Sequence, residues 1–180
     1  MNYALIDIGN TSIYAKIYPN NTEPYTVYIN RTEKALRLLV NHLNLDRILI
    51  SSVVPSVDAM IQSFGAPNVH FITHADFDSL DILIDPIESV GIDRLVNVLA
   101  VVSEYKKNAL VIDAGTVVTC CHINQKGAYQ GGIILPGFHM VRNALHQYAE
   151  KLPLISFPGS LPHLIGQSTQ GAIESGMFYG

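Results

Sequence analysis

The sequence has no tryptophan, only two cysteines and few charged residues. Its 180 residues include 0 Trp, 2 Cys and 14% charged side chains. Cys120 and Cys121 are adjacent, so on a strand they would point to opposite faces and a bond between them would be strained. There is no second cysteine pair and no HExxH arrangement among the seven histidines. We therefore assign neither a disulfide nor a zinc site.

Basic clusters and long apolar runs are missing as well. The chain has 11 Lys and Arg against 15 Asp and Glu, a formal net charge of −4, and these charges are scattered. Nothing supplies the basic stripe that a nucleic-acid backbone requires, so we expect no nucleic-acid partner. No apolar run reaches the ~18 residues of a membrane span, and the first residues enter a strand pattern without a basic leader. We expect a cytoplasmic protein that does not enter the membrane.

The pattern that is present is strand, turn, strand, strand, helix, and it occurs twice. The first copy predicts strands over residues 3–8, 13–18 and 25–29 and a helix opened by Thr32 and Glu33. The second predicts strands over 109–112, 117–123 and 129–135 and a helix after Pro136-Gly137. Between the copies we expect a strand over 47–54, a helix from Pro55, a strand over 69–73, mostly loop over 76–89 and a helix over 93–106. This order indicates an α/β protein with a boundary near Lys107 and Asn108.

Each copy has an aspartate two residues before a glycine, in Asp7-Ile8-Gly9-Asn10-Thr11 and in Asp113-Ala114-Gly115-Thr116. A glycine lets a phosphate approach the backbone amides, and a carboxylate beside a polyphosphate points to magnesium between them. A single such turn is better explained as ordinary hairpin chemistry. Two in equivalent positions favour a phosphate-binding cleft, because hairpins alone give no reason to repeat the aspartate. The chain has neither a G-x-x-x-x-G-K-[ST] loop nor a G-x-G-x-x-G turn.

A third motif, Gly91-Ile92-Asp93-Arg94, opens the predicted helix over 93–106. Asp93 alone is most simply explained as an acid that complements the helix N-terminus. A helix cap does not explain Arg94. A guanidinium can bind a carboxylate through two parallel hydrogen bonds, and the adjacent aspartate can act as a base. The pair suits a substrate that has both an acid and a hydroxyl. Gly131-Gly132 and Pro136-Gly137 are weaker evidence for a site, because a purely structural role, as a tight strand edge and a helix start, is about as probable.

Together these motifs resemble type III pantothenate kinases. The resemblance rests on five motifs in the family's order, namely Asp7-x-Gly9-Asn10-Thr11, Gly91-x-Asp93-Arg94, Asp113-x-Gly115-Thr116, Gly131-Gly132-x-Ile134-x-Pro136-Gly137, and Ser168-Thr169 with Ser175-Gly176. It implies the actin-like ATPase superfamily, with two ribonuclease H-like domains of mixed sheets flanked by helices, here over 1–107 and 108–180. It also implies transfer of the ATP γ-phosphoryl group to the terminal hydroxyl of pantothenate, the first step towards coenzyme A. The family would continue past Gly180, so we expect the second domain to be incomplete.

The resemblance also implies roles for individual residues. Asp93 would be the general base, Asp7 would face magnesium, directly or through water, and Asp113 would ligate a monovalent cation, potassium or ammonium. The ATP-binding residues would be Asp7, Ile8, Gly9, Asn10, Thr11, Ser12, Ile13, Tyr14 and Thr116, and the pantothenate-binding residues Gly91, Ile92, Asp93, Arg94 and Thr169. Thr169 would complete the pocket of a neighbouring subunit in a homodimer. The dimer contact would use the helix that carries Phe138, Val141, Leu145 and Tyr148.

Two alternatives stay open at this stage. Another kinase of the superfamily, acting on a sugar or a carboxylic acid, would share the paired turns but not Gly91 to Arg94. A non-catalytic regulatory protein could keep the same fold, although the presence of Asp7, Asp93 and Asp113 favours an enzyme. One side of the substrate pocket departs from the family: Pro86 has a slightly different spacing, and Leu83 or Ile84 stands where a tyrosine is usual.

Overall fold

The computed structural model describes residues 1–42, 45–105 and 108–180. These residues form two compact units, Met1–Val111 with Cys121–Gly132 and Ile112–Cys120 with Ile133–Gly180. The chain thus passes between the units more than once. The boundary predicted near Lys107, and the predicted end of the preceding helix at Lys106, lie outside the described residues. The division into domains at 107 and 108 stays a prediction.

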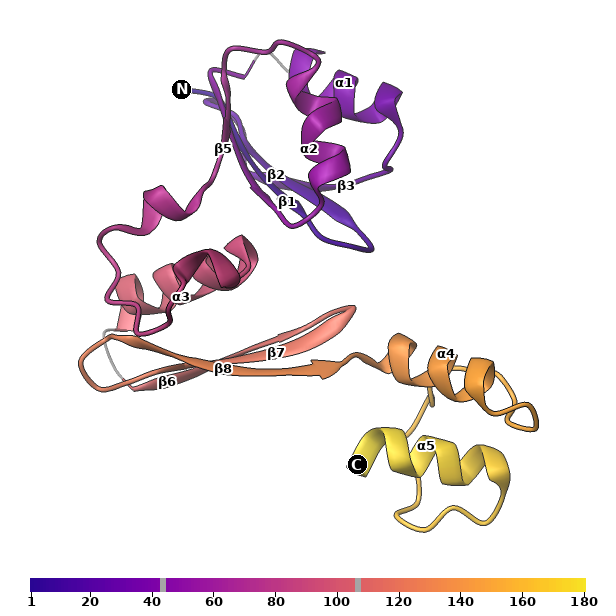
Figure 1. Ribbon diagram of the computed structural model, residues 1–180. Coiled ribbons are helices and arrows are strands. Elements are labelled where there is room, and N and C mark those ends of the chain that lie inside the picture. Colours follow the sequence, from indigo (N-terminus) through magenta and orange to yellow (C-terminus); the bar gives the residue numbers. More distant parts are fainter. Residues whose placement is uncertain (43–44, 106–107) are drawn as a thin grey trace. The chain divides into compact units, whose positions relative to one another are not determined.

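A five-stranded sheet in the order β3-β2-β1-β4-β5 organises the first unit (Figure 1). Its strands are β1 (Tyr3–Ile8), β2 (Ile13–Tyr18), β3 (Tyr25–Ile29), β4 (Arg47–Ser52) and β5 (Val69–Phe71). Short turns join β1, β2 and β3, and these strands pair antiparallel. Helices α1 (Glu33–His42) and α2 (Pro55–Gln62) carry the longer connections, so β4 pairs parallel to β1 and β5 parallel to β4. The carboxyl ends of β1 and β4 therefore meet at one edge.

The strand alternation explains the core of this sheet. Ala4, Ile6 and Ile8 of β1 are at most 2% exposed, and the alternate residues of β2 are buried with them. Figure 1 shows α1 and α2 side by side on one face of the sheet. Leu36 of α1 and Ile61 of α2 belong to the same buried cluster. Pro55 opens α2 at a position where a missing N–H is tolerated.

A second apolar cluster of the first unit surrounds α3 (Ile92–Tyr105). Leu95 and Val98 pack there with Phe77, Cys121 and Tyr129. The segment predicted to be mostly loop contains two short 3₁₀ helices, η1 (His74–Phe77) and η2 (Ile87–Ser89), so that prediction was incomplete. The sequence pattern missed them because a single 3₁₀ turn is too short to show a helical period.

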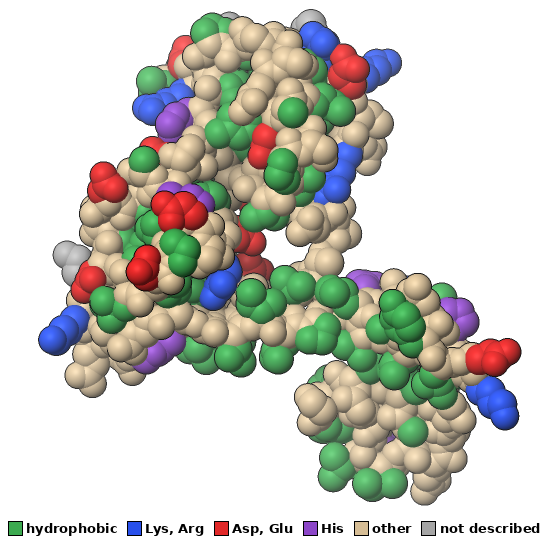
Figure 2. All heavy atoms as spheres, in the orientation of Figure 1, with side chains coloured by type: hydrophobic (Ala, Val, Ile, Leu, Met, Phe, Trp, Pro, Cys, Tyr) green, Lys and Arg blue, Asp and Glu red, His purple; other side chains and the backbone are tan. Residues whose placement is uncertain are grey.

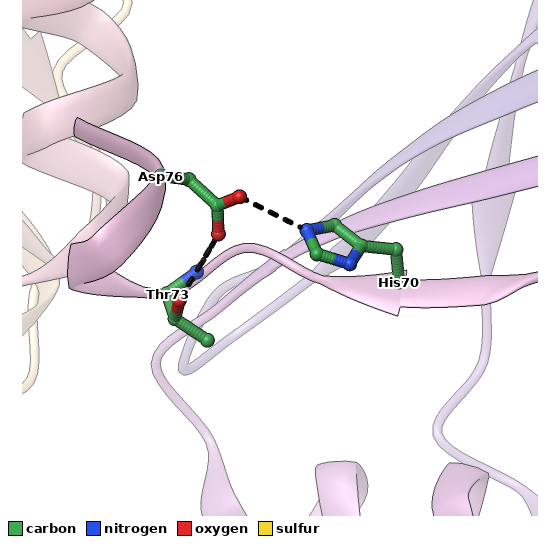
Figure 3. A network of polar contacts seen from close by, with 3 residues as sticks. All are labelled: His70, Thr73 and Asp76. Atoms are coloured by element: carbon green, nitrogen blue, oxygen red, sulfur yellow. Dashed lines mark hydrogen bonds and ion pairs between the residues drawn. The ribbon is translucent and has the colours of Figure 1, made fainter. Parts of the chain in front are cut away.

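A capping box fixes the start of η1 (Figure 3). The backbone N–H and the hydroxyl of Thr73 both donate to Asp76 Oδ2, at 2.8 and 3.0 Å. His70 Nε2 lies 3.2 Å from Asp76 Oδ1. The backbone hydrogen bond from Thr73 is the main cause that holds the pKa of Asp76 below its ordinary value of 3.8.

Strands β6 (Ala109–Ala114), β7 (Val117–Ile123) and β8 (Tyr129–Pro136) form a three-stranded sheet in that order. Helices α4 (Phe138–Tyr148) and α5 (Thr169–Tyr179) follow. Many hydrophobic side chains are exposed on these elements and in the segment between the helices, as Figure 2 shows. Ile133, Ile134, Leu164 and Ile165 are among the exposed residues. In α4, Phe138 packs against Phe157 with ring centroids 4.4 Å apart, whereas Tyr148 is 83% exposed.

The expected α/β class, with sheets flanked by helices, is confirmed. Several details differ from the sequence prediction. The strand expected over 47–54 ends at Ser52, and the strand expected over 69–73 ends at Phe71. Asp113 lies inside β6 rather than in the turn after it, because the strand continues to Ala114. The residue pattern did not predict helix α5 (Thr169–Tyr179). Within the described ranges, no helix is long and apolar enough to cross a membrane.

Candidate active site

The first Asp-x-Gly turn connects β1 to β2. Gly9 N donates to Ser12 O at 3.0 Å, and Asp7 is an exposed residue of β1, in register with Tyr14 of β2. Gly9 does not have a positive φ. A Cβ placed on it would meet nothing nearer than Ser12 O at 3.5 Å, which is an ordinary contact. Neither the backbone nor the packing requires glycine here, and the missing side chain leaves room for a ligand to approach the backbone closely.

Two residues beside this turn escaped the sequence prediction. The guanidinium of Arg31 donates from Nη2 to Gly9 O, which places a cation at the turn. Ser51 of β4 is in register with Asp7, and within the part of the chain that the structure describes its buried hydroxyl has no hydrogen-bond partner. A buried polar atom left unpaired costs roughly 1–3 kcal/mol, which a ligand or a bound water would relieve. No local pattern marks Ser51, because its position depends on the strand register.

The Gly91 motif forms the start of α3. Asp93 is half-buried, and its Oδ1 accepts a hydrogen bond from Arg94 N at 2.8 Å. A Cβ on Gly91 would lie 2.5 Å from Asp93 Oδ1. Gly91 is therefore needed for the carboxylate of Asp93 to turn back over the helix start. This contact fits the simple explanation of Asp93 as a helix-capping acid and leaves its predicted role as a base untested.

Val53 links the first turn to the Gly91 motif. Its N–H donates to Ile8 O at 3.1 Å, immediately before Gly9. Its Cγ1 is 3.9 Å from the position of a Cβ on Gly91. The structure thus brings these two motifs together at the carboxyl ends of the parallel strands β1 and β4, the edge at which open α/β sheets bind their ligands.

The second Asp-x-Gly turn, between β6 and β7, belongs to the second unit. Gly115 N donates to Val117 O at 2.9 Å, and Gly137 N donates to Thr116 O at 3.1 Å. A Cβ on Gly137 would lie 2.5 Å from Thr116 O. Pro136-Gly137 therefore serves close packing against this turn, which favours the structural explanation of the glycine. Gly131 has a φ of +111°, a conformation that side chains disfavour.

Thr169, the predicted pantothenate contact in the second unit, is exposed at the first position of α5. The side chain of Ser168 caps this helix by accepting from Gly171 N at 3.0 Å. A cavity of about 790 Å³ lies between residues 158–168 and α5, with Gly171 and Glu174 in its lining. Of the predicted site residues, Asp7 to Tyr14 and Gly91 to Arg94 belong to the first unit. Asp113, Thr116 and Thr169 belong to the second.

Comparison with known proteins decides the family. The family model described as type III pantothenate kinase matches residues 4–180. The type III pantothenate kinase of Exiguobacterium sp. is 33% identical, with 98% of this chain and 76% of that protein covered. The enzyme of Halalkalibacterium halodurans is 34% identical with the same coverage. This chain belongs to the type III pantothenate kinase family.

A solved structure supports the fold of this family member. The crystal structure of a conserved Baf family protein from Campylobacter jejuni aligns with a TM-score of 0.63 and 21% sequence identity. The alignment covers 98% of this chain and 74% of that one. At this identity the likeness shows the fold alone, and it extends over both units of the chain.

The side chain of Arg94 makes two hydrogen bonds to residues on strands β7 and β8. Its Nε donates to Cys121 Sγ at 3.3 Å, and its Nη2 donates to Tyr129 Oη at 2.6 Å. Burial by itself lowers the pKa of Arg94, but the hydrogen bond to Cys121 and the neighbouring Tyr129 and Asp93 raise it overall. Burial raises the pKa of Tyr129 well above its ordinary value of 10, so the phenol stays protonated. Arg94 is thus a cation beside a neutral phenol.

The donor set at the first turn fits magnesium as a kinase of this family would use it. Among the described residues, no three His, Cys, Asp or Glu side chains form a group that could hold a metal. Magnesium in kinase sites usually takes one or two carboxylates and completes its shell with waters and phosphate oxygens. Asp7 and Ser51 are in register on neighbouring strands, and the Ser51 hydroxyl has no hydrogen-bond partner among the described residues, so the two would supply part of such a shell.

Proposed function

We propose that this protein phosphorylates pantothenate with ATP, giving 4'-phosphopantothenate, the first intermediate on the way to coenzyme A. Membership of the type III pantothenate kinase family supports this function. The structural observation that carries it is the link through Val53, which joins the Asp7 turn to the motif with Asp93 and Arg94. A nucleotide-binding turn and a motif for a hydroxy acid then lie at one sheet edge.

The first turn is the proposed ATP-phosphate site. The open space at Gly9 lets phosphate oxygens approach the backbone of residues 8–14, and Arg31 adds a positive charge at the turn. Thr116 of the second turn is the proposed further ATP contact. Asp7 would hold magnesium, which would supply positive charge beside the ATP phosphates.

Asp93 is the proposed general base and Arg94 the proposed partner of the pantothenate carboxylate. The hydrogen bond from Arg94 N orients the Asp93 carboxylate at the start of α3. In the proposed step the carboxylate accepts the proton of the substrate hydroxyl as that oxygen bonds to the γ-phosphorus, while the bond from the γ-phosphorus to the bridging oxygen breaks and ADP leaves. The fork geometry of a guanidinium suits a planar carboxylate. Gly91 and Ile92 complete the proposed substrate contacts of this chain, and Thr169 is proposed to complete those of a neighbouring subunit.

Asp113 is the proposed ligand of a monovalent cation, potassium or ammonium. It is an exposed carboxylate just before the second turn, and oxygen ligands suit such cations. Sodium should support less activity because its smaller radius requires a tighter oxygen cage. The proposed place of this reaction is the cytoplasm.

A homodimer through α4 is the proposed assembly. Phe138, Val141 and Leu145 of the apolar stripe are only half-buried, and Tyr148 is exposed. A self-complementary contact over this stripe would cover them, and a stable dimer should bury at least about 1,000 Å² in total. Light scattering should give a mass near twice 19.7 kDa. A fully active monomer at nanomolar concentration would rule the dimer out.

An assay of ATP consumption with and without pantothenate tests the proposed function. The full chain should consume ATP in the presence of magnesium and pantothenate, and much more slowly with sugars or with other hydroxy acids. Equal rates on sugars would instead indicate a related kinase of the superfamily. ATP binding without transfer to any of these acceptors would indicate a non-catalytic protein.

A further inference from the structure

The side chain of Arg94 closes a three-membered hydrogen-bonded group with Cys121 and Tyr129. The guanidinium donates to Cys121 Sγ and to Tyr129 Oη, and these two atoms lie 3.3 Å from each other. Arg94 comes from α3, Cys121 from β7 and Tyr129 from β8, and all three belong to the first unit. Nothing in the proposed reaction so far uses Cys121 or Tyr129.

The two acceptors are fixed in the core. Tyr129 is 0% exposed and Cys121 is 2% exposed, and both belong to the apolar cluster around α3. Arg94 is only half-buried. An arginine with one end on immobile core atoms loses less freedom when it binds a ligand than one that is free in solvent. The core atoms therefore determine the direction in which the guanidinium faces.

The donor count shows which edge remains for a ligand. A guanidinium has five N–H donors in a rigid fork. The edge formed by Nε and Nη2 is directed at Cys121 Sγ and Tyr129 Oη. The edge formed by Nη1 and Nη2 keeps one N–H of each nitrogen, and the second N–H of Nη1 points back along the side chain. That edge can receive a carboxylate through two parallel hydrogen bonds.

Tyr129 also holds the neighbouring segment through its backbone. Its N–H donates to Asp81 O at 2.8 Å, and its carbonyl accepts from Leu83 N at 2.9 Å. This segment contains Leu83 and Ile84, where the sequence departs from the family's tyrosine. Tyr129 therefore bonds the Arg94 side chain through its hydroxyl and the adjacent segment through its backbone.

We propose that Tyr129 and Cys121 are positioning residues, which hold the guanidinium of Arg94 so that its remaining edge accepts the carboxylate of the substrate. They would thereby set the preference for an acid over its uncharged amide. The proposal rests on the proposed function, because it takes pantothenate as the substrate and Arg94 as its carboxylate partner.

The test is Tyr129→Phe in the full chain, assayed with pantothenate and with the primary amide of pantothenate. The change removes one hydroxyl and keeps the buried ring. The KM for pantothenate should rise roughly tenfold, as expected for one lost hydrogen bond to a charged group. The kcat should change much less, and the KM for ATP should stay the same. The ratio of kcat/KM for acid over amide should fall by the same factor.

Tyr105→Phe, at the exposed end of α3, is the matched control and should change none of these values.

A double-mutant cycle with Arg94→Lys shows whether Tyr129 acts by positioning Arg94 or only by packing in the core. If Tyr129 acts through Arg94, Tyr129→Phe should have little further effect on the acid-to-amide ratio in the Arg94→Lys background. Cys121→Ser, which keeps a hydrogen-bonding atom, should retain more of the ratio than Cys121→Ala. An unchanged ratio in Tyr129→Phe, in a wild type that does prefer the acid, would overturn the positioning role alone. A wild type that phosphorylates neither compound would overturn the proposed function, and the positioning role with it.

Discussion

The hairpins β1–β2 and β6–β7 share a motif but differ in what surrounds them. Each has an aspartate two residues before a glycine whose N–H bonds a carbonyl across the turn. In β1 the alternate residues Ala4, Ile6 and Ile8 are buried, whereas in β6 Leu110 and Ile112 are 60% and 61% exposed. The local pattern thus determines the hairpin, while burial depends on the helices that pack on the sheet.

The two turns also have different supports. Arg31 reaches the first turn through a side chain and contacts Gly9 O. Gly137 supports the second turn through its backbone, which approaches Thr116 so closely that no side chain fits between them. The first turn is thus supported by a cation beside an open glycine. The second is supported by tight packing. The difference predicts that substitutions at the first turn affect ligand use, and that those at Gly137 affect stability.

The largest expected effect is at Asp93, which Val53 connects to the first turn. Asp93→Asn should lower turnover by roughly 10² to 10⁴-fold, the usual range for a lost general base, while ATP still binds. Steady-state kinetics and calorimetry with Mg-ATP measure the two quantities. Asp78→Asn, an exposed aspartate of the same unit, is the control. Near wild-type turnover in Asp93→Asn would exclude the base.

The same substitution in both hairpins distinguishes the two proposed cations, magnesium at Asp7 and a monovalent cation at Asp113. Asp7→Asn should lower kcat/KM for Mg-ATP by roughly 10²-fold, because an interaction that offsets the phosphate charge is lost. Asp113→Asn should have a smaller effect and should remove the difference between potassium and sodium at matched ionic strength. If wild-type rates are equal in potassium, ammonium and sodium, the monovalent site is absent. If Asp7→Asn leaves both affinity and turnover unchanged, the first turn is structural.

Replacing Gly137 and Gly9 by alanine tests whether the two turns are held in place differently. Gly137→Ala should reduce the free energy of unfolding by about 1–3 kcal/mol, because the new Cβ overlaps the Thr116 carbonyl and the backbone must shift. Gly9→Ala should change stability by less than about 0.5 kcal/mol and weaken ATP binding instead. Thermal unfolding and ATP titration measure both. Comparable destabilisation by the two variants would mean that the turns are supported alike.

The smallest effect concerns the cap of η1. Since the pKa of Asp76 is lowered in the folded state, its ionised form stabilises the fold above the ordinary value of 3.8, and this contribution is lost as the pH falls below it. Asp76→Asn should cost less than about 1 kcal/mol at neutral pH, as expected for an exposed cap. The difference from wild type should shrink towards pH 3. Urea unfolding at both pH values checks this, and a constant difference would contradict it.

Short-range patterns were sufficient for most of the fold. The alternation in β1 and β2 and the proline at the start of α2 are local signals, and the structure confirms the elements that they predict. Helix α5 was missed because Gly171 and Gly176 lower its helix propensity and its apolar residues do not form a clear stripe. The N-cap Ser168 was the one signal that could have revealed it.

The candidate site was predictable only in part. The motifs identified Asp7, Asp93 and Arg94, but the partners of these residues depend on pairing across the chain. Tyr129 is 35 positions from Arg94, and Ser51 comes beside Asp7 only through the register of β4. Such contacts depend on tertiary structure, which no local period encodes.

Transfer of labelled γ-phosphate from ATP tests the central claim most directly. With magnesium and pantothenate, the wild-type chain should place the label in phosphorylated pantothenate, and Asp93→Asn should lose this transfer while it still binds Mg-ATP. Label found only in inorganic phosphate, at the same rate with or without pantothenate, would contradict the account.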